Sequence, residues 1–122
     1  MTSQLNVDII ADKAGSGTVD LHKQHALKAH VLATAAAVLD GDNDFNISSA
    51  SDDGTGSYTI NLTSAMSGSD YSVVGTPKST NDRNLVFDSL STTSIFHEIF
   101  GYNGSLADPS DGFSTFVAGE LA

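Results

Sequence analysis

The sequence predicts a mainly β protein, a small antiparallel β-sandwich or barrel-like module, and three observations carry this prediction. Apolar and polar residues alternate with a period of two in several short segments, which is typical of strands with one buried face. Clusters of glycine, asparagine, aspartate and serine separate these segments at short intervals, as in sandwiches and barrels. With 122 residues the chain is long enough for one domain, and neither an internal repeat nor an interdomain linker is visible.

The clearest strand is Ser57–Thr63, in which Tyr58, Ile60 and Leu62 share one face. The turn cluster at residues 52–56 precedes it. Its two glycines can adopt positive φ, and an aspartate side chain can accept a hydrogen bond from a nearby amide. We interpret this turn as a folding device, because a register slip of one residue would point the apolar face outward. Further strands are expected at Phe45–Ser48, Tyr71–Thr76, Leu85–Leu90, Ser94–Gly101 and Phe113–Leu121.

Residues 24–39 allow two interpretations. Gln24–Ala29 and the run Ala35–Ala37 favour a helix by intrinsic propensity, and apolar pairs seven residues apart fit a short oligomeric seam. The alternative is two short strands at residues 29–33 and 36–40. Propensity alone favours the helix.

The first part of the chain is expected to be an extended arm. Leu5–Ile9 and Thr18–Leu21 alternate like strands but can bury little surface alone, and Ala14–Gly17 interrupts them. We therefore predict an N-terminal arm over residues 1–27, for attachment or oligomer contact, and a β module over residues 28–122. Because such strand pieces should gain stability from partner copies, we expect a homotrimer.

The charges exclude one class of partner. The net charge is −10, and residues 1–39 are neutral, so the remaining residues are strongly acidic, with Lys78 and Arg83 as their only bases. A nucleic-acid-binding surface requires clustered lysine and arginine, which is absent, and we expect no nucleic-acid partner. No apolar run is long enough to span a bilayer, so no membrane insertion is expected.

Enzymatic chemistry is not expected either. The chain has no cysteine, which excludes disulfides, thiolate zinc sites and a cysteine nucleophile. No Gly-x-Ser-x-Gly elbow is present, and Gly15–Thr18 lacks the lysine of a phosphate-binding loop. The abundant acids single out no pair for glycoside hydrolysis. We assign no catalytic residue, no cofactor and no metal site.

Two sets of side chains have the chemistry of metal ligands. Asp40, Asp42 and Asp44 have the spacing of a calcium loop, but Phe45 replaces the required glycine and Ser51 the bidentate glutamate. We interpret this run as a solvated acidic turn. The second set is His22, His25 and His30, which could face a symmetry axis of an oligomer. They contain no His-x-His pair, and we interpret them as surface or interface residues.

Two segments are candidates for contact with a host surface. Tyr102 and Phe113 flank the long turn Asn103–Gly112, and Arg83 lies in the polar loop at residues 78–84. These are plausible tip loops for binding a host-surface glycan or protein. Most of the nine aromatic residues should be core, and the His97–Glu98 pair should lie on a packed or edge strand.

The segment from Asn46 to Met66 adds a resemblance. It contains an Asn-Ile-Ser-Ser strand, an Asp-Asp-Gly-Thr-Gly turn and a Tyr-Thr-Ile-Asn-Leu-Thr strand. This block resembles one found in phage and prophage tail-fibre-like proteins, and Ser69–Gly75 and Phe113–Gly119 are similar to that family's following strands. Lys28–Ala33 stands where the family has Lys-Ala-Trp-Val-Asn-Phe, without the aromatic residues. The N-terminal pieces Leu5–Ile9 and Gly17–Leu21 resemble the start of many phage structural proteins.

The resemblance implies a trimeric module on the virion surface, a tail fibre or fibre tip for host attachment, assembled in the cytoplasm of the bacterial host. It implies contacts with other virion proteins, such as tail or capsid subunits, and it shifts residues 29–40 toward strands. Long shaft regions are missing from this sequence. The alternative is therefore a capsid decoration protein or short head fibre, with a tail adaptor as a third reading.

Overall fold

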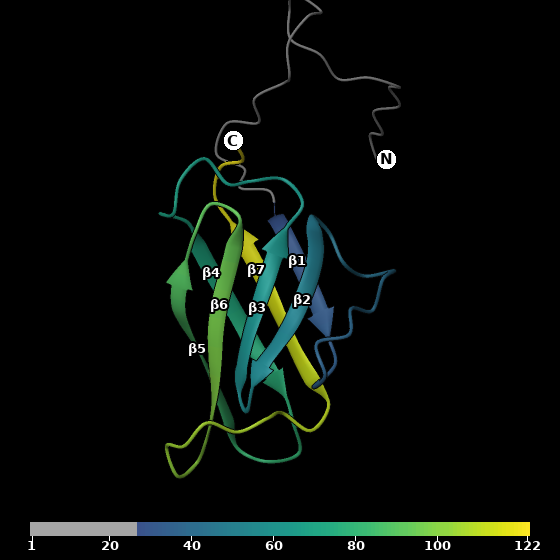
Figure 1. The fold of residues 1–122 in the computed structure, drawn as a ribbon, viewed down its shortest axis with the longest axis vertical. Coiled ribbons are helices and arrows are strands. Elements are labelled where there is room, and N and C mark those ends of the chain that lie inside the picture. The colour runs from purple at the N-terminus through teal and green to yellow at the C-terminus, as the bar shows by residue number, and fades with distance from the viewer. Residues whose placement is uncertain (1–26) are drawn as a thin grey trace, which may run out of the picture.

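In the computed structural model, which describes residues 27–122, seven strands form two antiparallel sheets that pack face to face (Figure 1). The three-stranded sheet has the order β1-β7-β4, and the four-stranded sheet has the order β2-β3-β6-β5. The strands are β1 Leu27–Ala33, β2 Ile47–Gly54, β3 Ser57–Leu62, β4 Ser72–Lys78, β5 Arg83–Leu90, β6 Ser94–Gly101 and β7 Gly112–Ala118. The prediction of a mainly β protein is confirmed, and the fold is a small sandwich. The predicted arm lies outside the described residues, apart from Leu27.

The prediction of a helix over residues 24–39, which propensity favours, is wrong for the part of that segment that the structure describes. Residues 27–33 form β1, in which Ala29, Val31 and Ala33 are buried at alternate positions. This strand pairs along its length with β7, so sheet pairing and burial outweigh the helix propensity of the alanines, which is a weak determinant beside tertiary contacts. Residues 34–37 form a turn, closed by a hydrogen bond from the Ala37 amide to the Thr34 carbonyl (2.9 Å).

The β2–β3 hairpin forms as its sequence predicts. Gly54 has φ +128° and Gly56 has φ +68°, and the Gly54 amide donates to Asp52 Oδ1 (3.0 Å). The turn therefore fixes the register that buries Tyr58, Ile60 and Leu62. Strand β2 is longer than predicted and continues to Gly54.

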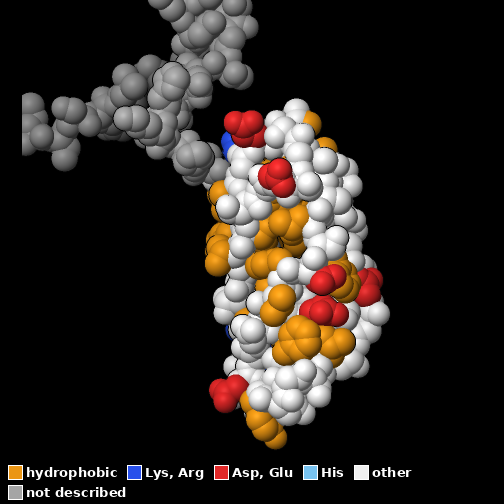
Figure 2. Space-filling view, turned by 90° about the vertical axis from the view of Figure 1, so that its left-hand side faces the viewer, with side chains coloured by type: hydrophobic (Ala, Val, Ile, Leu, Met, Phe, Trp, Pro, Cys, Tyr) orange, Lys and Arg blue, Asp and Glu red, His pale blue; other side chains and the backbone are white. Residues whose placement is uncertain are grey.

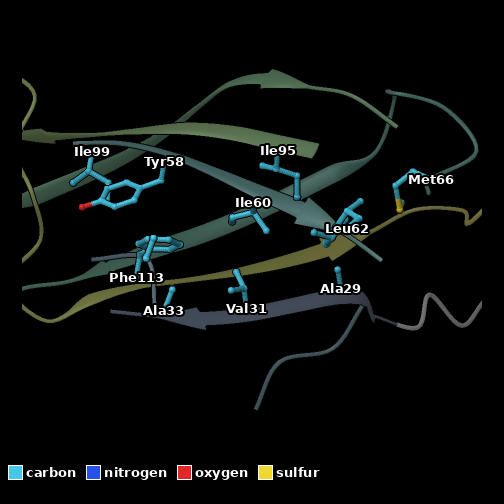
Figure 3. Packing of buried hydrophobic residues seen from close by; sticks show 12 residues of the cluster. Ala29, Val31, Ala33, Tyr58, Ile60, Leu62, Met66, Ile95, Ile99 and Phe113 are labelled. Carbon is cyan, nitrogen blue, oxygen red and sulfur yellow. The ribbon is translucent and has the colours of Figure 1, made fainter. Parts of the chain in front are cut away.

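The core is a single layer between the two sheets (Figure 3). Tyr58, Ile99 and Phe113 lie at one end, and Leu62 and Met66 lie at the other. The buried residues of β1 are small (Ala29, Val31 and Ala33), and they pack into one core cluster with the large side chains of β3 in the other sheet.

Fewer aromatic residues are buried than expected. Of the nine, only Tyr58 and Phe113 are fully buried, while Tyr71 and Phe87 pack partly against the core. Phe45 and Tyr102 are exposed, and Phe116 is 40% exposed on the outer face of β7. The prediction that most aromatics are core is therefore wrong, because several of them lie at outward positions of the strands or in the connections.

One carboxylate connects the hairpin turn to the loop before β7. Asp108 Oδ1 accepts hydrogen bonds from the Gly56 amide (2.6 Å) and from the Tyr58 hydroxyl (3.4 Å). The same hydroxyl also donates to the Ala35 carbonyl (3.0 Å). Burial, followed by the nearby carboxylates of Asp108 and Asp52, raises the pKa of Tyr58, so this side chain remains a donor.

Replacing this carboxylate should cost stability. Asp108→Ala leaves the buried Gly56 amide without its acceptor, and we expect the free energy of unfolding to fall by about 1–2 kcal/mol. Asp108→Asn keeps an acceptor oxygen and should lose less than half as much. Urea denaturation of both variants measures this; equal losses would mean that the amide bond contributes nothing.

Candidate functional site

The best candidate site is a small cleft where β5 begins and β6 ends. It has a volume of about 150 Å³ and is lined by Asp82, Arg83, Asn84, Phe100, Gly101 and Tyr102. Cross-strand pairing builds it, since Arg83 pairs with Gly101 and Asn84 with Phe100. Figure 1 shows that the start of β5 and the end of β6 lie at the end of the sandwich opposite the start of β1 and the C-terminus. The cleft is thus remote from the point where the N-terminal segment joins.

Tyr102 presents its ring to solvent from a loop that is closed by hydrogen bonds. The side chain is 87% exposed. The loop that carries it is closed by hydrogen bonds from the Gly101 amide to the Ser105 carbonyl (2.9 Å) and from the Gly104 amide to the Gly101 carbonyl (3.0 Å). Asn103 Oδ1 accepts a further bond from the Ser105 amide (3.2 Å). An aromatic ring held by such a loop loses little conformational entropy when it contacts a ligand.

Arg83 is held beside this ring by backbone carbonyls. Its Nε donates to the Asp108 carbonyl (3.1 Å) and its Nη1 to the Asp82 carbonyl (3.1 Å). The guanidinium carries five N–H donors, so it keeps donors for a ligand after making these two bonds. The loops before β5 and before β7 are therefore tied together at the cleft.

The side chains of the cleft offer complementary chemistry. Arg83 supplies donors, Asp82 supplies acceptors, and the Asn84 amide can supply both. Tyr102 and Phe100 supply flat apolar surface next to these polar groups. Such a combination suits a hydroxyl-rich molecule with one apolar face, and the small volume limits the ligand to one ring or one side chain.

The structure brings together two of the three predicted tip residues. Arg83 and Tyr102 share the cleft, whereas Phe113 lies in the core, with its ring centroid 4.8 Å from that of Tyr58. Sequence reasoning did not assign Asn84 and Phe100 to the cleft, because only the register of β5 against β6 places them there.

The acidic run at residues 40–44 is an internally bonded turn. Both carboxylate oxygens of Asp44 accept backbone amides, Oδ1 from Leu32 (2.9 Å) and Oδ2 from Gly41 (3.1 Å). The Asn43 amide group donates to Asp40. Within residues 27–122, no three aspartate, glutamate or histidine side chains converge in a way that could hold a metal ion. Asp44 therefore has a structural role in this turn.

The histidines separate into two environments. The His30 ring stacks on Phe116 on the outside of the three-stranded sheet, with a centroid separation of 4.5 Å and an interplanar angle of 9°. His97 lies on β6, one of the two inner strands of the four-stranded sheet, and is fully buried among Tyr58, Phe87 and Phe113. His22 and His25 lie outside the described residues.

Comparisons with protein-family models, with curated proteins and with solved structures each found no match. In the part of the chain that the structure describes, no helix has the length and hydropathy needed to cross a membrane.

Proposed function

We propose that this chain is a structural protein of the phage particle surface, a trimeric tail-fibre or fibre-tip-like module that contacts the host. The observation that carries the proposal is the position of the Arg83–Tyr102 cleft at the end remote from the start of β1. A module attached through its N-terminal arm would hold this end away from the particle. The cleft would then bind a glycan or protein on the host surface.

The resemblance to tail-fibre-like proteins supports the same proposal. The block on which it rests, Asn46–Met66, includes the β2–β3 hairpin, whose two positive-φ glycines set the register of the core strand β3. The turn residues of that block therefore have a folding role, and the proposed binding chemistry lies elsewhere, in the cleft lined by residues 82–84 and 100–102.

Tyr102 is expected to be the most sensitive residue of the cleft. Tyr102→Ala removes the exposed ring without touching the core. We expect the purified variant to block adsorption of virions carrying this chain at least about 10-fold less effectively than the wild-type protein. Tyr102→Phe keeps the ring and should retain most of that capacity. Phe96→Ala removes an aromatic ring at an outward position of β6, outside the lining of the cleft, and serves as the control.

The outcomes separate the proposals. Wild-type protein that never blocks adsorption would contradict host attachment. If wild type and Tyr102→Ala block adsorption equally well, the host contact lies outside the cleft. Imaging of particles labelled with an antibody to this chain gives the position: a few copies at the tail fit the proposal, whereas tens to hundreds on the head fit a capsid decoration protein or head fibre instead.

A further inference from the structure

The outer face of the three-stranded sheet carries a row of hydrophobic side chains. Phe116 on β7 pairs with His30 on β1 and with Val74 on β4. Phe45 extends the row, because its amide and carbonyl exchange hydrogen bonds with those of His30 (2.8 and 3.0 Å). Val74 is 65% exposed and Phe45 55%. The row thus crosses the whole sheet, and with Leu27 beside it forms an apolar face that no described residue covers.

This face also differs from the rest of the molecule in charge. Strands β1, β4 and β7 contain no aspartate or glutamate, and they hold Lys28 and Lys78, two of the three bases in residues 27–122. The four acidic residues that lie in strands are all in the other sheet; they are Asp52, Asp53, Asp88 and Glu98. At mid-height of Figure 2, acidic side chains gather on the margin of the four-stranded sheet, and hydrophobic ones project from the opposite margin.

The charge distribution limits which surfaces of two copies can meet. Two molecules with this excess of carboxylates repel each other over most orientations. Contact centred on Phe116 and Val74 brings no strand carboxylate against another, because the acidic turn at residues 40–44 lies at the β1 edge of the sheet. It also removes exposed apolar groups from water, which is favourable in proportion to the area buried. An apolar patch of this kind on an otherwise acidic protein is typical of a contact surface.

We propose that the outer face of β1-β7-β4, centred on Phe116, is the self-association surface of this protein, and that its partner is the same face of a second copy. The stacked rings of His30 and Phe116 form a flat platform at its centre. This surface is distinct from the Arg83–Tyr102 cleft, and the proposal does not rest on host attachment.

A matched pair of variants of the full-length chain tests the proposal. Phe116 and Phe96 both lie at outward positions of a central strand, one in each sheet. Phe116→Lys would place a charge in the contact, whereas Phe96→Lys would place it on the acidic sheet. We expect light scattering to show an oligomer for wild type and for Phe96→Lys, and a monomer of 12.6 kDa for Phe116→Lys. Circular dichroism melts confirm that both variants are folded.

Every other pattern overturns the proposal. These patterns are a monomeric wild type, an oligomer that survives Phe116→Lys, and equal dissociation of both variants. A monomeric wild type overturns the proposal even if Phe116→Lys lowers the melting temperature, because this variant also loses the stack between His30 and Phe116. A wild-type dimer that Phe116→Lys dissociates would support the face and contradict the trimer, so the two proposals fail separately.

Discussion

Acidification from pH 7 to pH 4 is expected to remove about 3 kcal/mol of stability through His97 alone. The side chain is fully buried, and neither ring nitrogen has a hydrogen-bond partner among residues 27–122. Desolvation therefore lowers the pKa of His97 from 6.5 to about 4. The ring of Tyr58 stacks on the ring of His97 and can itself titrate. Because the pKa of Tyr58 is raised, this side chain stays neutral between pH 7 and pH 4.

The direction follows from the protons that each state binds. The unfolded state takes up a proton near pH 6.5, whereas the folded state does so only near pH 4. The contribution of neutral His97 is therefore fully present above about pH 6.5 and is lost progressively as the pH falls to about 4.

Denaturant unfolding of wild type and His97→Phe at pH 7 and pH 4 measures this loss. The carboxylates titrate in both proteins, so the smaller acid-side loss expected for His97→Phe isolates the imidazole. An NMR titration of the wild-type His97 ring covers the case in which His97→Phe does not fold. A ring pKa near 6.5 would contradict the argument.

The strand pattern could be predicted from sequence because alternation reports burial directly. Ser57–Leu62 and Ser94–Gly101 form almost as predicted, since each has one face in the core and a turn cluster at each end. The conformation of residues 27–33 was ambiguous in sequence because alanine favours helix locally. Only the pairing of this segment with β7, which begins at Gly112, makes it a strand.

The candidate site was less predictable for a related reason. Arg83 and Tyr102 could be proposed from their positions in polar loops, but their proximity depends on the register of β5 against β6, which includes an irregularity between Phe87 and Ser89. The apolar face was not predicted at all. Phe45, Phe116 and Val74 look like core residues in sequence, and only the sheet order shows that they point outward together.

Gly112 is expected to be the position at which one added methyl group costs most. It begins β7 with φ +118°, and a Cβ there would lie 1.9 Å from the Ala33 carbonyl oxygen at the end of β1. That oxygen belongs to the backbone and cannot move aside without separating the two strands. Gly112→Ala should therefore cost more than about 4 kcal/mol, which for a domain of this size means little or no folded protein.

Gly54 is a matched control within the same molecule. It has a similar φ of +128°, but a Cβ at this position meets no atom within 4 Å. Gly54→Ala thus carries only the backbone cost of a positive φ, on the order of 1–2 kcal/mol. The difference between the two variants, measured by soluble yield and by urea midpoint, isolates the close approach of β7 to β1. Similar losses for both would mean that φ alone sets the requirement for glycine, and that the start of β7 can shift away from Ala33 at little cost.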